Sequence, residues 1–238
     1  MNSTNRRHFS IVGVLIVIGT FVMYFILDSA LPLPVQASQE AVHIDGLIDL
    51  HVWLIAFLFS VVMVFMLYAI VVFRRREGDE SDGEHFEGNT ALEIAWTVAP
   101  IVLVLIFGVI GFRVLQDVTY ASEDAIEIKV VGFQWGWRFE YPELNGHVDT
   151  ELVMPVDQRV KFVMTSEDVN HNFWVPEFRV KQDLVNGRET MLYITAIEPG
   201  EYKLRCAELC GTAHYNMLAP VRVLEDAEYG DWVAENTQ

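Results

Sequence analysis

The stretch from Cys206 to Tyr215 reads Cys-Ala-Glu-Leu-Cys-Gly-Thr-Ala-His-Tyr, and Met217 follows two positions later. It places two thiols four residues apart, then an imidazole, then a thioether. These soft ligands together favour copper, and a weak methionine ligand is typical of copper electron-transfer sites. A single-copper site of this type needs only one cysteine. The second cysteine of the pair Cys206 and Cys210 would therefore allow the same two sulfurs to bridge a second metal ion.

Two other uses of the cysteines stay open at this point. A disulfide between Cys206 and Cys210 would close a very short loop and would leave His214 and Met217 without a role. Such a bridge also requires the two Cα atoms to lie within about 7 Å. A zinc site usually takes two pairs of ligands, and the chain has only two cysteines. The ligand set favours copper over both alternatives.

Three apolar runs without charge mark the N-terminal half, at residues 11–27, 52–73 and 94–112. A run of about 20 apolar residues spans the hydrocarbon core of a bilayer, whereas a soluble helix of that length carries a polar face. The second and third runs therefore predict a transmembrane helical hairpin at residues 38–118, with helices at about 50–74 and 91–116.

The first run predicts either a signal peptide or an additional transmembrane helix over residues 1–37. Arg6 and Arg7 precede it, and Val35-Gln36-Ala37 resembles a cleavage site, although Ala37 lies well beyond the apolar stretch. Both alternatives stay open.

Basic clusters predict the same topology in either case. Arg6, Arg7 and the run Arg74 to Arg76 fall on the cytoplasmic side, which places everything after Gln116 outside. We expect residues 77–90 to form a solvated cytoplasmic loop. The expected location is the plasma membrane of a prokaryote, crossed more than once, with the C-terminal domain on the outer side.

Beyond residue 118 the pattern changes to short alternating segments separated by turn residues such as Glu198-Pro199-Gly200. Several short strands at this spacing predict an antiparallel sandwich or barrel, here over residues 119–225. We expect a short helix or tail at 226–238. The segments with strand character are Ile126–Val130, Arg159–Val163, Met191–Ile194 and Glu201–Leu204.

The motif Cys-x-Glu-x-Cys-Gly-x-x-His-x-x-Met resembles the binuclear copper (copper-A) loop of subunit II of haem–copper cytochrome c oxidases. Two further blocks agree with it, Ser166–His171 with Lys181-Gln182-Asp183, and the aromatic segment Gly132–Tyr141. The similarity runs from about residue 45 to about 225. It implies a membrane-anchored, all-β fold whose outer domain is a cupredoxin-like Greek-key β-barrel.

The resemblance also implies a ligand set. Cys206 and Cys210 would bridge two copper ions, and His171 and His214 would each bind one of them. Met217 would be a weak ligand to one ion, and the backbone carbonyl of Glu208 a weak ligand to the other. In the family, the Glu208 side chain also reaches a magnesium or manganese ion shared with the catalytic subunit.

Further residues acquire roles by resemblance. Trp135 matches the exposed tryptophan through which the family accepts electrons from cytochrome c, although Gly136 stands where an aromatic is common. The alternative is that Trp135 is a core residue. Glu93, at the start of the third apolar run, lies near the mouth of a proton-uptake path, unless it only caps its helix.

Glu140, Asp149 and Asp168 fall at or near positions that the family uses to dock cytochrome c. Residues 121–238 carry ten Lys/Arg and 21 Asp/Glu, a net charge of −11. An acidic face steers a basic partner. The alternative is a general acidic surface, as in a protein from a high-salt environment.

The sequence as a whole predicts the electron-accepting subunit of a terminal cytochrome c oxidase, part of a proton-translocating oxidoreductase. The implied partners are the catalytic haem-bearing subunit I, other oxidase subunits, cytochrome c and the lipid bilayer, with no nucleic acid. We expect haem and the oxygen site only on the partner subunit. The alternatives are the copper-A subunit of a nitric oxide reductase and a stand-alone membrane-anchored copper carrier.

Overall fold

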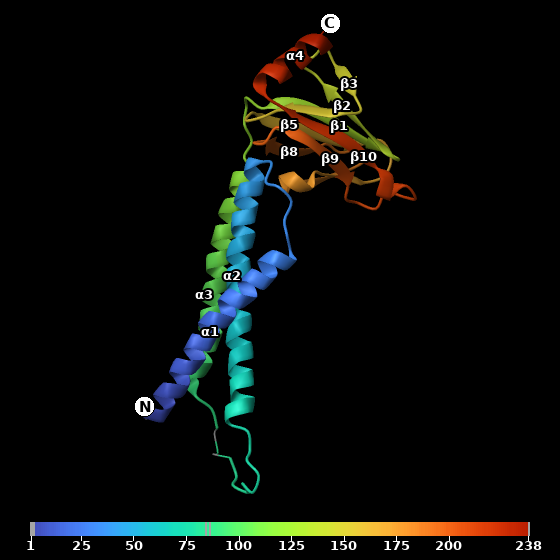
Figure 1. Ribbon diagram of the computed structural model, residues 1–238. Coiled ribbons are helices and arrows are strands. Elements are labelled where there is room, and N and C mark those ends of the chain that lie inside the picture. The colour runs from blue at the N-terminus through green and yellow to red at the C-terminus, as the bar shows by residue number, and fades with distance from the viewer. Residues whose placement is uncertain (1–2, 84, 86, 238) are drawn as a thin grey trace. The chain divides into compact units, whose positions relative to one another are not determined.

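The computed structural model describes residues 3–83, 85 and 87–237 (Figure 1). The chain forms two compact units. One, the helical unit, contains residues 1–33 and 46–111, and the other, the β unit, contains residues 34–45 and 112–238.

Three helices are long and apolar enough to cross a membrane: α1 (Ser3–Ala30), α2 (Gln39–Val72) and α3 (Thr90–Val118). Helix α2 begins earlier than the apolar run predicts. Ser38 caps the helix at this earlier point, because its Oγ accepts a hydrogen bond from Ala41 N at 3.0 Å. The helix therefore includes the polar residues that precede the apolar run. Asn89 Oδ1 caps α3 in the same way, through Leu92 N at 3.1 Å.

Within the helical unit, small and aromatic side chains set the contacts between helices. A Cβ on Gly19 would lie 3.2 Å from Ser60 Oγ, so this glycine allows α1 and α2 to approach closely. Tyr24 stacks on Trp53 with ring centroids 3.8 Å apart. Many apolar side chains of these helices are exposed, which suits contact with lipid. In the expected solvated loop, residues 84 and 86 lie outside the described residues.

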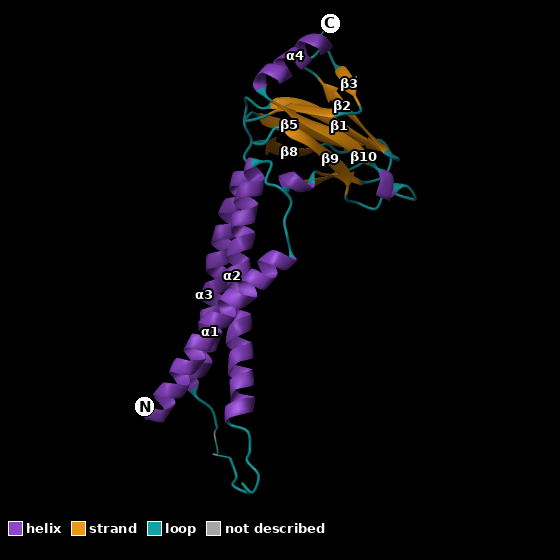
Figure 2. Cartoon of the chain, in the orientation of Figure 1, coloured by secondary structure: helices purple, strands orange, loops and turns teal. Residues whose placement is uncertain are grey.

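The β unit consists of two five-stranded sheets (Figure 2). One has the order β3-β2-β1-β5-β8 and the other β4-β10-β9-β6-β7. The strands of the first sheet are β1 (Ile126–Phe133), β2 (Gly136–Tyr141), β3 (His147–Asp149), β5 (Arg159–Ser166) and β8 (Thr190–Thr195). Those of the second are β4 (Leu152–Pro155), β6 (His171–Trp174), β7 (Lys181–Leu184), β9 (Gly200–Cys206) and β10 (Leu218–Leu224).

The strand pairing is mostly antiparallel, with two parallel pairs, β1 with β5 and β10 with β4. Alternation decides which side chains enter the core. In β2, Trp137, Phe139 and Tyr141 are buried while the residues between them are partly exposed. These rings join Phe162 and Phe173 in one continuous hydrophobic core. The prediction of a membrane-anchored, cupredoxin-like β domain is confirmed.

Short helical segments complete the β unit. The 3-10 turns η1 (Pro176–Phe178) and η2 (His214–Asn216) lie in connections, and α4 (Asp226–Asn236) follows β10. Helix α4 agrees with the expected C-terminal helix, and Trp232 anchors it to the core, where it meets Tyr141 edge to face at 5.0 Å.

Residues 34–45, which we call the strap, are part of the β unit. Ala37 N donates to Glu177 O at 3.1 Å, and Ala37 O accepts from Ile197 N at 3.0 Å. Ala37 and Ser38 are fully buried. The strap backbone around Ala37 is therefore packed into the β unit.

Two ion pairs hold the strap. Arg179 donates from Nε to Asp45 Oδ1 at 2.8 Å and from Nη2 to Asp45 Oδ2 at 2.9 Å. Arg159 pairs with Glu40, whose side chain is 2% exposed, and Thr195 N donates to Glu40 Oε2 at 3.1 Å. Each buried carboxylate thus has a cation and further donors, as burial of charge requires.

Candidate metal centre

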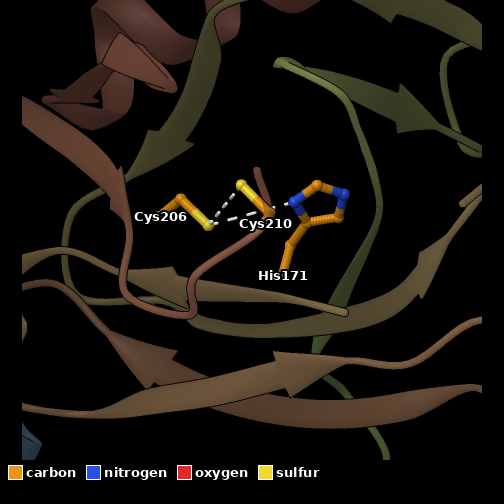
Figure 3. Close-up of side chains that lie close together, drawn as sticks. All are labelled: His171, Cys206 and Cys210. Carbon is orange, nitrogen blue, oxygen red and sulfur yellow. Dashed lines mark hydrogen bonds between the residues drawn. The ribbon is translucent and has the colours of Figure 1, made fainter. Parts of the chain in front are cut away.

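The predicted copper ligands come from three places in the β unit. His171 begins β6, Cys206 ends β9, and the loop between β9 and β10 carries Cys210, His214 and Met217. Strands β6 and β9 are antiparallel neighbours, with Phe173 opposite Cys206. The start of β6 at His171 and the end of β9 at Cys206 therefore lie at the same end of the sheet. Figure 3 shows the His171 ring and the two cysteine side chains converging. The fold therefore brings together residues that lie far apart in the sequence.

The donor atoms of this cluster lie within contact distance. The two Sγ atoms are 3.7 Å apart, and Cys206 Sγ lies 3.9 Å from His171 Nδ1. Cys210 Sγ lies 3.5 Å from His214 Nδ1 and 3.7 Å from the Met217 sulfur. Both cysteines are free, so the structure contains no disulfide here. The ligand atoms of His171, Cys206 and Cys210 lie within 4.8 Å of one another, close enough to hold a metal ion.

Most of this cluster is shielded from water. His171 and Met217 are fully buried, and Cys206 and Cys210 are 9% and 2% exposed. Burial, together with the neighbouring Cys206 thiol, raises the pKa of the Cys210 thiol to about 12. The Cys210 thiol therefore keeps its proton at neutral pH until a cation displaces it. Buried sulfur and nitrogen donors are the chemistry that a copper ion prefers, so the residues fit the metal.

The hydrogen bond at Nε2, the ring nitrogen of His171 that faces away from the cysteines, determines the tautomer of this ring. His171 Nε2 lies 2.8 Å from Asp168 Oδ1, and because an ionised carboxylate only accepts hydrogen bonds, the proton belongs on Nε2. Nδ1, which faces Cys206, is then left with a free lone pair. Metal-binding histidines commonly have such an outer partner.

Asp168 itself accepts several hydrogen bonds, among them the backbone N–H of Gln134 at 2.8 Å and of Val169 at 2.6 Å. Desolvation of Asp168 works to raise its pKa, but the hydrogen bonds from His171, Gln134 and Val169 outweigh it and lower the pKa below its usual value. The carboxylate is therefore ionised at neutral pH and engaged with the metal-site loops.

Trp135 lies in the turn between β1 and β2 and is 40% exposed, whereas Trp137 in β2 is 2% exposed. Trp135 Nε1 donates to the backbone carbonyl of Cys210 at 3.2 Å. Its indole thus joins the protein surface to the cysteine loop. The buried ring of Trp137 lies 6.3 Å from the His171 ring, centroid to centroid.

The Glu208 side chain is exposed, while its carbonyl oxygen accepts from the Cys206 thiol at 3.2 Å. Leu209 and Tyr215, in the same loop, are 80% and 83% exposed. The loop therefore presents apolar side chains outward and its candidate ligands inward.

The three predicted docking acids have different surroundings. Glu140 in β2 pairs with Arg138 at 3.3 Å, and Arg138 also pairs with Glu167 at 2.7 Å. Asp149 lies on the adjacent strand β3 and accepts the backbone N–H of Thr150. Asp168, as described above, is bonded to His171.

Glu93 lies in the other unit, in the first turn of α3, where it is exposed. Its carbonyl accepts from Thr97 Oγ1 at 2.9 Å. The position suits both the predicted proton-path role and a simple stabilisation of the helix N-terminus.

Sequence reasoning gave no role to Gln134, although it lies in the aromatic block. Gln134 Nε2 donates to Cys210 O at 2.7 Å. The only feature of the sequence that could have pointed to Gln134 is that it is a polar residue next to Trp135, in a turn before a strand. The ion pairs of the strap could not be predicted from the sequence either, because the two residues of each pair lie far apart in the chain.

Comparison with known proteins is consistent with this geometry. The family described as "Cytochrome C oxidase subunit II, periplasmic domain" matches residues 143–224, and "Cytochrome C oxidase subunit II, transmembrane domain" matches residues 26–114. Cytochrome c oxidase subunit 2 of Synechocystis sp. is 33% identical, over 86% of this chain and 75% of that protein.

Two further relatives agree. The alternative cytochrome c oxidase subunit 2 of Bradyrhizobium diazoefficiens is 31% identical, over 81% of this chain and 80% of its own length. Cytochrome c oxidase subunit 2 of Cereibacter sphaeroides is 31% identical, over 84% of this chain and 78% of its own length. The chain belongs to the family of subunit II of cytochrome c oxidase. It is a membrane-anchored part of an oxidoreductase complex, with its β domain on the outer side.

Proposed function

We propose that this chain is the subunit through which electrons enter a terminal cytochrome c oxidase, and that its β unit holds a binuclear copper-A centre. The observation that carries the proposal is the cluster of two free thiols, two imidazoles and a thioether with contacts of 3.5–3.9 Å. When bound, a copper pair would supply one-electron transfer between an external donor and the haem of a separate subunit.

In this proposal each side chain has a defined task. Cys206, Cys210, His171 and His214 would hold the two copper ions. Met217 and the carbonyl of Glu208 would be weaker ligands that tune the potential. Asp168 orients His171 by accepting a hydrogen bond from its Nε2–H, and the buried surroundings exclude water from the cysteine sulfurs.

The exposed Glu208 carboxylate is proposed as a ligand to a magnesium or manganese ion completed by the catalytic subunit I. Its exposure supports this, because a shared ion needs a ligand that faces outward from this chain. Glu93 is proposed to lie at the start of a proton path into the same partner. The chain would cross the plasma membrane of a prokaryote more than once, which the three apolar helices support.

Trp135 is proposed to pass electrons from cytochrome c to the copper pair. Its support is a half-exposed indole bonded to the backbone of a bridging cysteine. Glu140, Asp149 and Asp168 are proposed to attract the basic donor. The relatives named above are all cytochrome c oxidase subunits, which does not favour a nitric oxide reductase or a stand-alone carrier.

The experiment that tests the function uses the purified oxidase complex with reduced cytochrome c in a stopped-flow instrument. We expect the near-infrared band of the copper pair to bleach before the haem is reduced. Trp135→Phe should slow this first phase severely while leaving the copper content and donor binding nearly unchanged. A haem that is reduced without prior bleaching of the copper band would contradict the proposal.

A further inference from the structure

The turn between β1 and β2 contacts both loops that carry the candidate ligands. Within this turn, Gln134 donates one hydrogen bond to each of the two loops. The backbone N–H of Gln134 donates to Asp168 Oδ2 at 2.8 Å, in the loop before β6. Its side-chain Nε2 donates to the carbonyl of Cys210 at 2.7 Å, in the loop after β9. Gln134 thus bonds to the partner of His171 and to Cys210 itself.

We propose that Gln134 is a positioning residue for the copper pair and its electron input, a clamp that fixes the Cys210 backbone relative to His171 and Trp135. The proposal rests on the proposed copper function and adds a residue to it. A continuous chain of contacts supports the clamp. It runs from the His171 ring through Asp168 and the Gln134 backbone to the Gln134 side chain and Cys210.

The carbonyl of Cys210 accepts two hydrogen bonds, the shorter from Gln134 at 2.7 Å and the longer from Trp135 Nε1 at 3.2 Å. A carbonyl oxygen has two lone pairs, so both bonds can form at once. The amide of Gln134 therefore shares with the indole the task of orienting this peptide group. Without Gln134, the cysteine loop would be joined to this turn through the longer indole bond.

Close packing around Gly211 supports the same role. Gly211 has φ +121°, a backbone conformation that favours glycine, and a Cβ there would lie 3.0 Å from Gln134 Nε2 and 3.2 Å from Trp135 Cζ2. The loop backbone therefore passes directly against the two donors.

The clamp also has an electrostatic consequence. Donors that point at a carbonyl beside the metal site offset the partial negative charge of its oxygen. Removing one such donor should favour the oxidised, more positive state of the copper pair and so lower its mid-point potential. Hydrogen bonds around a cysteine ligand are known to tune the reduction potential of copper sites.

The test compares Gln134→Met, which keeps the size of the side chain but removes the donor, with Gln134→Glu, which sets a carboxylate against the carbonyl. The matched control is Gln158→Met, because Gln158 is exposed and its Nε2 donates to Asp226 at 3.1 Å, outside the ligand cluster. The full-length chain is used in its oxidase complex. Copper content, mid-point potential, the rate of copper reduction by cytochrome c and the thermal midpoint are measured.

We expect Gln134→Met to lower the potential and to slow copper reduction by about tenfold, a typical effect of losing an outer-sphere partner. Gln134→Glu should lower both further, while Gln158→Met resembles the wild type. A residue that only fills space would tolerate Met and Glu equally, with no shift of potential. Loss of copper from a Gln134→Met chain, with an unchanged thermal midpoint of the metal-free chain, would also support the clamp.

Two results would overturn the clamp. One is a wild-type potential and rate in both Gln134 variants, and the other is a large fall of the thermal midpoint in both, which would make Gln134 a residue of the fold. Failure of the underlying function is distinguishable from either result. In that case the wild-type chain itself would lack the copper pair.

Discussion

The cysteine loop and the strap are both irregular segments attached to the same two sheets, yet they are held in different ways. The strap is fixed by backbone hydrogen bonds and by two buried ion pairs, so the chain itself supplies every partner. The loop from Cys206 to Met217 instead turns buried sulfur and nitrogen donors toward one another. The strap is thus ordered by folding alone, whereas the proposed copper ions would complete the loop.

The largest effect is expected in the loop. Cys206→Ser should abolish the copper pair, because a hydroxyl is a poor substitute for a bridging thiolate. The thermal midpoint of the metal-free protein should change little, since one small atom is replaced in the loop and the strap is untouched. Copper analysis and a thermal melt of the same preparation check both statements. Retention of two copper ions in this variant would contradict the proposed role of Cys206 as a ligand.

The strap should respond in the opposite way. Arg179→Met leaves Asp45 buried without its cation, and breaking a buried pair costs about 3 kcal/mol of unfolding free energy. Denaturant unfolding measures this cost, while the copper spectrum should stay that of the wild type. The exposed Arg188 provides a control, Arg188→Met, which should change little. A changed copper spectrum with unchanged stability would contradict the separate roles.

Metal uptake by the loop should depend on pH. Because burial raises the pKa of the Cys210 thiol to about 12, the thiol is protonated at neutral pH and copper must displace its proton. We therefore expect protons to be released on binding and the apparent affinity to rise with pH. Addition of copper to the metal-free chain in weak buffer, followed with a pH indicator, measures this. Uptake without proton release would mean that the Cys210 thiol was already ionised.

The smallest effect is expected at the surface of the same unit. Asp149→Asn should raise the apparent Michaelis constant for a basic cytochrome c and flatten its dependence on salt, with little change in maximal rate. Exposed charges are already screened over about 8 Å at 0.15 M salt, so the effect is modest. Neutralising Asp231 in α4 should do less. Equal effects of both variants would favour a general acidic surface.

Local patterns were sufficient to predict the fold class. The uncharged runs at 11–27 and 94–112 lie within α1 and α3, and the run at 52–73 lies in α2 except for its last residue. The alternating segments at Ile126, Arg159, Met191 and Glu201 all lie in strands. What the patterns missed depends on contacts distant in sequence. The early start of α2 reflects the Ser38 cap, and the strap depends on arginines more than a hundred residues away.

The ligand cluster shows the same limit. The spacing of Cys206, Cys210 and His214 is local and visible in the sequence, whereas His171 joined the set only through resemblance to a family. Its approach to Cys206 depends on the pairing of β6 with β9. The bonds that Gln134 and Asp168 make to the ligand loops depend on how three connections meet, which no periodicity encodes.

Copper content and electron spin resonance of the full-length chain, purified in detergent and loaded with copper, are the most direct test of the proposed copper pair. We expect two copper ions per chain and a multi-line signal from one unpaired electron shared between them. Cys210→Ser, prepared in parallel, should lack this signal. A single-copper spectrum in the wild-type chain, or stoichiometric zinc in place of copper, would contradict it.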